Sequence, residues 1–347
     1  MKLLRRTVDN ILEKNHISAP DRELDAAERR SHLVAHGDFP LAYAAATEPY
    51  LKSFGDQRGF VAYGQKMGYT FAMGDPVAGA ADRAKLIEEF IATFRQPSFA
   101  GISREVAEIL AGLGYRITQF GLDSVLDLPG HSFAGKDGKS IRYATSWMRQ
   151  NAITVEERPI EDFPAETIER MSQQWRRTRV NSRREIRFLN RSFLPQPEEG
   201  VRRFFAVDPA GKPIALISFD PIYRNGAVTG YLASSKRRYP ETSSYVDLGI
   251  MRHATDCFRE EGHETLWLGL LPMVRTKPLP GRDDPLLRAI FAWAYRSKWV
   301  NARIFSLQGI AAYKDRYRGR DIPVYVATPG RYSAVTLIAL LRLIKLI

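Results

Sequence analysis

The order of strand-like and helix-like segments restricts the fold of this chain more than any other feature. Residues 59–65 and 69–74 alternate as two strands, and the Lys-Met-Gly between them predicts a tight turn. Residues 81–94 then place apolar side chains on one helical face. Residues 104–114 predict a second helix that Gly114 ends, and residues 115–128 predict another strand. Helix and strand thus alternate through the first part of the chain.

A second run of the same kind follows a polar stretch that contains Pro159 and Pro164. Asp162 is expected to cap its first helix, which continues into an arginine-rich segment over residues 175–191. The further predicted elements are strands at 202–209, 213–223 and 264–272, helices at 243–262 and 284–299, and a final pairing that begins at 303–309.

These two runs predict a mixed α/β fold whose plan is used twice, although the sequence itself shows no repeat. A chain of 347 residues also exceeds the size of one small core. We expect one domain over residues 1–152, a second over 153–330 that holds the catalytic site, and an apolar tail over 331–347.

The formal net charge of +12 favours a partner that carries phosphate, either a nucleic acid or an anionic membrane. The single cysteine, Cys257, excludes an intramolecular disulfide and fits a reducing compartment. The first fifteen residues interrupt their apolar positions with charge and lack a small-residue cleavage site, which argues against a secretory signal.

The tail ends in YSAVTLIALLRLIKLI, where Arg342 and Lys345 are the only charges. This segment is shorter than the roughly 20 apolar residues that a spanning helix needs. It is consistent either with a helix packed on a domain or with an amphipathic segment that contacts a membrane surface, and the sequence leaves both open.

Several blocks, in order, resemble the carboxy-terminal catalytic domain of the bacterial aminoacyl-phosphatidylglycerol synthases, the multiple-peptide-resistance-factor family. The blocks are GFVAYGQKMGYTFAMGDPV (59–77), Trp175 with RFLNRSF (187–193), LWLGLLPM (266–273) and FSLQGIAAYKDRYRGRDIPVYVA (305–327). The resemblance implies two tandem GNAT-like (acyltransferase-like) domains with mixed central sheets. It also implies transfer of an aminoacyl group from aminoacyl-tRNA to the glycerol hydroxyl of phosphatidylglycerol, at the inner face of the bacterial cell membrane.

The chain departs from the family pattern in three places. An Asp-Leu-Met-Arg block is expected near Tyr231–Lys236, where YLASSKRR lacks the acid, and a Gly-Arg-Phe becomes Arg191-Ser192-Phe193. The sequence has no counterpart of the family's amino-terminal transmembrane part, so a separate membrane partner is expected to move the lipid product. These departures leave the amino acid and the acceptor open.

The segment 175–191 carries seven arginines and one acid, Glu185. Arginine binds phosphate through two parallel hydrogen bonds, and an aromatic ring offers a stacking face to a base or an alkyl chain. A solvent-exposed amphipathic helix would usually interleave glutamate with arginine. We therefore predict that the segment binds substrate through four residues: Trp175, Arg183, Arg184 and Phe188.

The closing block provides further candidates. The resemblance places it beside the reaction centre, where Lys314 contacts the substrate phosphate or the developing oxyanion. Tyr313 and Arg316 fall on adjacent faces of the same helical turn, after Gln308-Gly309. We assign Gln308, Tyr313 and Arg316 to substrate binding. Arg237 is assigned to the same role. A charged terminal helix without function is the alternative.

Asp247, in SYVDLGIMR, is the second candidate catalytic residue. The resemblance places an acid here that faces the site, where it would bind the aminoacyl ammonium or assist proton transfer. The alternative is an acid that complements the dipole of a helix N-terminus. Asp75, before Pro76, is expected to have a structural role in a turn.

No cofactor or metal is predicted. His32 and His36 lie four residues apart without a third ligand nearby. The phosphate-binding loop that acetyl-CoA-using relatives of the fold place at a helix start is not found, which favours a tRNA-borne donor. Two alternatives stay open: an N-acyltransferase that uses another activated acyl donor, and a non-catalytic basic adaptor that binds RNA or membrane.

Overall fold

The computed structural model describes residues 11, 13–136, 138–179 and 187–346. The strands are β1 (Lys52–Asp56), β2 (Gly59–Lys66), β3 (Tyr69–Met73), β4 (Val77–Ala78), β5 (Ser98–Ile102), β6 (Arg116–Asp127), β7 (Thr154–Glu157), β8 (Arg202–Val207), β9 (Pro213–Arg224), β10 (Ala227–Arg238), β11 (Thr265–Pro272) and β12 (Arg320–Thr328). The α-helices are α2 (Ala26–His36), α3 (Ala42–Thr47), α4 (Ala80–Phe94), α5 (Arg104–Gly112), α6 (Lys139–Gln150), α7 (Ala165–Arg177), α8 (Tyr245–Glu260), α9 (Pro285–Arg296), α10 (Lys298–Arg303), α11 (Leu307–Asp315) and α12 (Ala334–Leu343).

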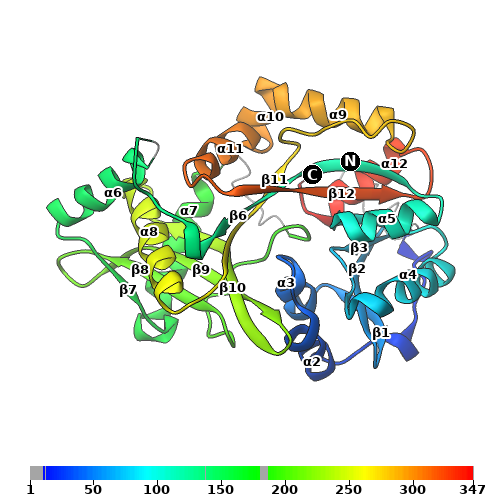
Figure 1. The fold of residues 1–347 in the computed structure, drawn as a ribbon, viewed down its shortest axis with the longest axis horizontal. Helices are drawn as coiled ribbons and strands as arrows, with labels where there is room; N and C mark the ends of the chain where they lie inside the picture. The colour runs from blue at the N-terminus through cyan, green and yellow to red at the C-terminus, as the bar shows by residue number, and fades with distance from the viewer. Residues whose placement is uncertain (1–10, 12, 137, 180–186, 347) are drawn as a thin grey trace.

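One mixed sheet runs through both halves of the molecule (Figure 1). Its strand order is β1-β2-β3-β5-β12-β6-β11-β10-β9-β8-β7, and β4 pairs with β2. The halves join where β6 pairs antiparallel with β11. Strand β12, near the end of the chain, lies between β5 and β6 and is antiparallel to both. The sheet therefore ties the last strand to the first half.

Strands β10 and β11 separate in the middle of the sheet. Their parallel pairing covers only Gly230–Leu232 opposite Thr265–Trp267. Beyond it, β10 continues along β9 and β11 continues along β6, each with a register shift close to the point of separation. Gly269 stands at the shift in β11 with φ +79°, a conformation that glycine adopts without steric cost. The separation opens the sheet toward α8 and α11.

Helices cover this sheet in separate apolar cores. Helices α4 and α5 bury Phe90 and Leu110 against the first half, and α6 and α8 bury Met148 and Phe258 against the second. Both α5 and α8 are followed by a glycine in the left-handed region, Gly114 and Gly262, which confirms the predicted stops.

The C-terminal helix packs on the first half. Ala339 and Leu343 of α12 are buried, and a Cβ at Gly64 of β2 would lie 3.0 Å from Leu343 Cδ1. Val335 and Ile338 of the same helix stay exposed. Among the helices in the described ranges, none is both long enough and apolar enough to span a bilayer.

Three sequence predictions of local structure were wrong. Asp162 does not cap α7, which begins after Pro164; it forms an ion pair with Arg158 at 3.0 Å instead. Residues 303–309 do not start a strand, because they join the end of α10 to α11, so that Gln308-Gly309 lies in the first turn of a helix. Helix α7 ends at Arg177, and Phe188 has φ +74°, so the arginine-rich segment is not one continuous helix.

Candidate functional site

Lys314 lies where β10 and β11 separate. Helix α11 packs on β11 and directs the Lys314 ammonium to the carbonyl oxygen of Leu270, which accepts its hydrogen bond at 2.9 Å. A Cβ at Gly269 would lie 3.6 Å from the Lys314 Nζ atom, an ordinary contact, so the positive φ rather than crowding is the reason for glycine here. The bulge of β11 and the helix together place one lysine at the opening of the sheet.

Asp123 of β6 is the acidic neighbour of this lysine. It lies directly across from Leu270 in the β6–β11 register. Burial lowers the pKa of Lys314, while the Asp123 carboxylate counteracts that shift and nearby Lys236 adds to it. Burial likewise raises the pKa of Asp123, against the effect of the Lys314 charge. The environment favours the neutral form of both groups, so a proton can be exchanged here near neutral pH.

Asp247, in the first turn of α8, is linked to this pair through Lys236. Its side chain is buried, and its two oxygens are each 3.4 Å from a cation of β10: Oδ2 from Lys236 Nζ and Oδ1 from Arg238 Nε. The contact with Arg238 lacks hydrogen-bond alignment, so Oδ1 is a buried acceptor without a hydrogen bond to a described residue. Asp247 therefore keeps acceptor capacity for one further donor.

Aromatic rings close the site. Lys236 Nζ lies 3.6 Å from the centre of the Tyr313 ring, a cation–π contact. The Tyr313 hydroxyl accepts a hydrogen bond from Tyr317 at 3.0 Å. Burial raises the pKa of Tyr313, with the negative charge of Asp247 acting in the same direction, so this hydroxyl stays protonated.

The last turn of α7 adds Trp175, and the segment just after it adds Arg179. The Arg179 guanidinium lies 3.9 Å from the centre of the Trp175 ring. Desolvation lowers the pKa of Arg179 and the Asp247 carboxylate opposes that shift, so the arginine lies within electrostatic range of the acid. We use "central cluster" below for Asp123, Arg179, Lys236, Arg238, Asp247, Tyr313 and Lys314.

The structure thus brings together four of the residues singled out from the sequence: Trp175, Asp247, Tyr313 and Lys314. Arg316 is exposed just beyond α11. Gln308 lies at the other end of α11, where its side chain donates to the Tyr295 carbonyl at 2.9 Å and helps to join α9 to α11. Arg183 and Arg184 lie outside the described residues.

One of the other assignments needs correction, and a second residue is buried. Phe188 is 0% exposed and belongs to the core beside Tyr43 and Leu51, so it has no free ring face for a substrate. Arg237 is buried on the opposite side of β10 from Lys236. Its guanidinium stacks 4.4 Å from the centre of the Trp175 ring, and its Nε donates to Ser172 at 3.1 Å. Arg237 therefore packs against Trp175, and its assignment to substrate binding stays a prediction.

Sequence reasoning did not identify Asp123, Lys236 or Arg238. The last two stand in YLASSKRR, the block noted for its missing acid, which contributes two cations at the same place. Asp123 lies among the apolar residues Leu122, Val125 and Leu126 of β6, where an unpaired acid would be costly. This cost is the feature of the sequence that could have identified Asp123 as a candidate.

Asp75 has the structural role expected for it. It is buried, and its Oδ1 accepts the Ser103 backbone N–H at 2.8 Å, just before α5 begins. Burial raises the pKa of Asp75 to about 6, although the hydrogen bonds from Ser103 favour the charged form.

This shift gives a testable pH dependence. A raised carboxyl pKa means that the folded state binds more protons than the unfolded state between about pH 4 and pH 6, so stability falls as pH rises through that window. Asp75→Asn keeps a hydrogen-bond acceptor but cannot ionise. We expect denaturant unfolding at several pH values to show the variant gaining relative stability from pH 4 to pH 7, by at most roughly 3 kcal/mol. An unchanged difference across this range would contradict the assignment.

The described ranges contain no group of three or more His, Cys, Asp or Glu side chains placed to hold a metal ion. His32 and His36 stack with ring centres 6.4 Å apart.

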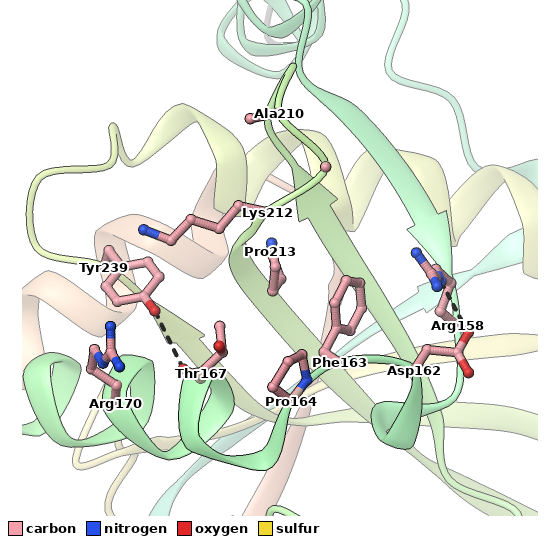
Figure 2. A pocket seen from close by; sticks show the side chains of 11 residues that line it. Arg158, Asp162, Phe163, Pro164, Thr167, Arg170, Ala210, Lys212, Pro213 and Tyr239 are labelled. Carbon is pink, nitrogen blue, oxygen red and sulfur yellow. Dashed lines mark hydrogen bonds and ion pairs between the residues drawn. The ribbon is translucent and has the colours of Figure 1, made fainter.

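A separate hollow of about 450 Å³ lies at the start of α7, below the hairpin that joins β8 to β9 (Figure 2). Arg158, Arg170 and Lys212 surround it, and Tyr239 forms part of its wall with its hydroxyl bonded to the Thr167 carbonyl. None of the residues predicted for the site lines it.

Comparison with known proteins identifies the family. A sequence profile of the phosphatidylglycerol lysyltransferase C-terminal family matches residues 30–328. The chain belongs to this family. A curated relative, the lysylphosphatidylglycerol biosynthesis bifunctional protein LysX of Rhodococcus jostii (strain RHA1), is 27% identical over 163 residues, which are 44% of this chain and 15% of the relative. The match therefore spans a small part of that longer protein.

Solved structures share the fold of this phosphatidylglycerol lysyltransferase-family chain, which is of the mixed α/β class expected from the sequence. The L-PGS structure from Bacillus licheniformis aligns with TM-score 0.74 and 17% identity, over 94% of this chain and 99% of that one. The C-terminal domain of a candidate lysylphosphatidylglycerol synthetase from Agrobacterium fabrum aligns with TM-score 0.73 and 18% identity, over 91% and 95%. FemX aligns with TM-score 0.52 and 10% identity, over 88% and 96%.

Proposed function

We propose that this protein transfers an aminoacyl group from aminoacyl-tRNA to the glycerol hydroxyl of phosphatidylglycerol, at the inner face of the cell membrane. The observation that carries the proposal is the central cluster, which combines a lysine of lowered pKa with a buried acid and further cations at the opening of the sheet. Family membership supports the lipid acceptor, because the family is named for phosphatidylglycerol and a lysyl group.

The reaction that suits this cluster is an exchange of esters. The acceptor hydroxyl oxygen attacks the aminoacyl carbonyl, a new carbon–oxygen bond forms, and the bond to the tRNA ribose breaks. The proton leaves the acceptor hydroxyl and arrives on the ribose oxygen, so the balance needs no oxidant, reductant or metal. The donor ester is already activated, so alignment and oxyanion stabilisation supply most of the catalysis.

In this proposal Lys314 carries the proton. Its neutral amine, favoured by burial, takes the proton from the acceptor hydroxyl and delivers it to the leaving ribose oxygen. Lys236 and Arg238 supply positive charge for the tetrahedral oxyanion and for the phosphates of the substrates.

In this proposal the Asp247 carboxylate receives the α-ammonium of the aminoacyl group, which displaces the Arg238 guanidinium that now covers Oδ1 at 3.4 Å without a hydrogen bond. We expect Asp247→Asn to raise KM for the aminoacyl-tRNA at least about tenfold, because it replaces a charge-assisted hydrogen bond with a neutral one. Kinetics with a donor whose α-amine is acetylated provide the control. The proposed contact predicts that the variant and the parent use that donor equally poorly, and a preserved advantage of the parent would contradict it.

Lipid extraction from a bacterial host that expresses the protein tests the function itself. The expected result is a new phospholipid that releases an amino acid on mild alkaline hydrolysis, absent from a host that expresses Lys314→Met. A lipid profile equal to that of the empty host would count against the proposal.

A further inference from the structure

Three large apolar side chains are exposed along one edge of the molecule. Leu286 and Trp293 of α9 are 58% and 60% exposed, and Trp299 of α10 is 60% exposed. Leu286 and Trp293 lie seven residues apart, about two helical turns, and so share a face. Figure 1 shows α9, α10 and α11 following one another along the edge above β12. We call Leu286, Trp293 and Trp299 the tryptophan face.

The tryptophan face is not needed to hold α9 on the protein. The opposite side of the helix does that, because Leu287, Phe291 and Ala294 are buried. Phe291 packs edge-on against Phe120 of β6, with ring centres 5.3 Å apart. The helix is therefore apolar both toward the core and toward solvent, whereas a helix that only covers a sheet is polar on its outer side.

The charges around the tryptophan face have one sign. Residues 285–314 contain no Asp or Glu. Arg296, Lys298 and Arg303 are exposed beside the two tryptophans and form no ion pair with any described residue. A surface that combines large aromatic side chains with unpaired cations suits an occupant that is apolar inside and anionic at its surface.

We propose that the tryptophan face docks on an anionic lipid bilayer and brings the neighbouring central cluster to the membrane surface. Tryptophan is enriched at the level of the lipid headgroups, where its ring is buried and its N–H stays hydrated. Basic side chains beside an apolar helix face add attraction to anionic lipids. Helix α10 packs against α11, which carries Lys314, so docking places the cluster close to the acceptor.

Charge argues against a second copy of this chain as the occupant. A symmetric dimer through this face would place the cations of one copy close to those of the other, because a two-fold interface repeats the same patch on both sides. The membrane assignment extends the proposed function, on which it rests for the identity of the acceptor lipid.

Vesicle binding without tRNA tests the docking separately from catalysis. The parent protein is expected to sediment with vesicles that contain phosphatidylglycerol, and Trp293→Ala with Trp299→Ala is expected to weaken binding about tenfold or more, because two aromatic side chains no longer enter the interface. Tyr143→Ala is the control, since Tyr143 is 53% exposed on the distant helix α6. Equal binding by the parent and the double variant would overturn the proposal.

Lipid composition and oligomeric state complete the test. Arg296→Gln with Lys298→Gln is expected to reduce binding to phosphatidylglycerol vesicles and to leave the weak binding to neutral phosphatidylcholine vesicles unchanged. A parent dimer in sedimentation velocity that becomes monomeric in the tryptophan variant would assign the face to a second copy and overturn the proposal. A failed lipid product with intact, tryptophan-dependent vesicle binding would instead reject the proposed function and keep the docking.

Discussion

Replacing Lys314 by methionine is expected to lower the rate of aminoacyl transfer by about 10²–10⁴-fold, the usual contribution of a positioned general base. Methionine has a similar length and occupies the same space below Gly269 without a proton to exchange. The measurement is single-turnover transfer from labelled aminoacyl-tRNA to lipid, which separates the chemical step from product release.

Arginine at the same position distinguishes two roles for this side chain. Lys314→Arg keeps the positive charge but cannot act as a base, because arginine does not lose its proton in proteins. If Lys314 carries the proton, both variants lose activity. In the parent protein, the rate rises with pH through the lowered pKa of Lys314. Activity near the parent level in the arginine variant would show that charge alone is used.

The fold is expected to survive these substitutions. A buried ammonium has a desolvation cost, and methionine removes it. Lys85→Met, on the exposed side of α4, is the matched control for the loss of one lysine. We expect its activity and its thermal unfolding to match those of the parent.

Replacing Arg191 by alanine is expected to reduce the free energy of unfolding by about 3–5 kcal/mol, the cost of leaving a buried acid without its partner. Arg191 is 6% exposed and bonds to Asp220 at 2.6 Å and to Glu198. Its guanidinium also lies 4.7 Å from the centre of the Tyr43 ring. The loss would leave buried Asp220 with the Ser234 hydroxyl as its hydrogen-bond partner and with Arg203 as the remaining nearby cation.

The test of Arg191 is a denaturant unfolding curve for each variant. Arg224→Ala is the matched control, because the Arg224–Glu264 pair, at 2.7 Å, is exposed on both sides. Exposed pairs contribute about 0–1 kcal/mol, so the control is expected to change stability little. Equal losses in the two variants would contradict a special role of the buried pair. The double variant Arg191→Met with Asp220→Leu should recover part of the loss, since it removes both charges.

Arg191 also explains one departure from the family pattern. The sequence comparison noted Arg191-Ser192-Phe193 in place of Gly-Arg-Phe. In the structure, Arg191 joins β9 to α3, and the Ser192 N–H donates to Glu48 at 2.6 Å. The changed residues thus form contacts between the two halves of the chain. The predicted division at residue 152 remains a proposal. Strand β12 falls in the predicted second domain by sequence, but it lies between β5 and β6 in the sheet of the first half.

Local patterns predicted much of the fold. Alternating apolar residues predicted the hairpin β2–β3, and the spacing of apolar residues predicted helix α4. Glycines that adopt a left-handed backbone predicted the ends of α5 and α8. Each of these signals depends only on residues close together in the sequence. The position of β12 between β5 and β6 does not, because it pairs residues about 200 positions apart. The edge strand β7 and the long strand β10 lack a strong alternating pattern and were missed for that reason.

The residues of the candidate site also fall into two groups, those that the sequence predicted and those that only tertiary contacts revealed. Lys314 and Asp247 were found from sequence because their surrounding blocks resemble a known family. Lys236 and Arg238 became visible only when β10 was seen to separate from β11 beside α8. Phe188 was assigned to substrate binding because it lies in an arginine-rich segment, but that pattern does not predict whether its ring is buried. Charge and block order indicated the chemistry, and tertiary contacts selected the residues.

Transfer of a labelled amino acid from aminoacyl-tRNA to phosphatidylglycerol vesicles by the purified protein tests the central claim most directly. The account predicts a labelled lipid whose formation requires both tRNA and phosphatidylglycerol and is lost in Lys314→Met. Binding to vesicles without transfer of label, with every amino acid supplied on its tRNA, would contradict the account and support a non-catalytic adaptor.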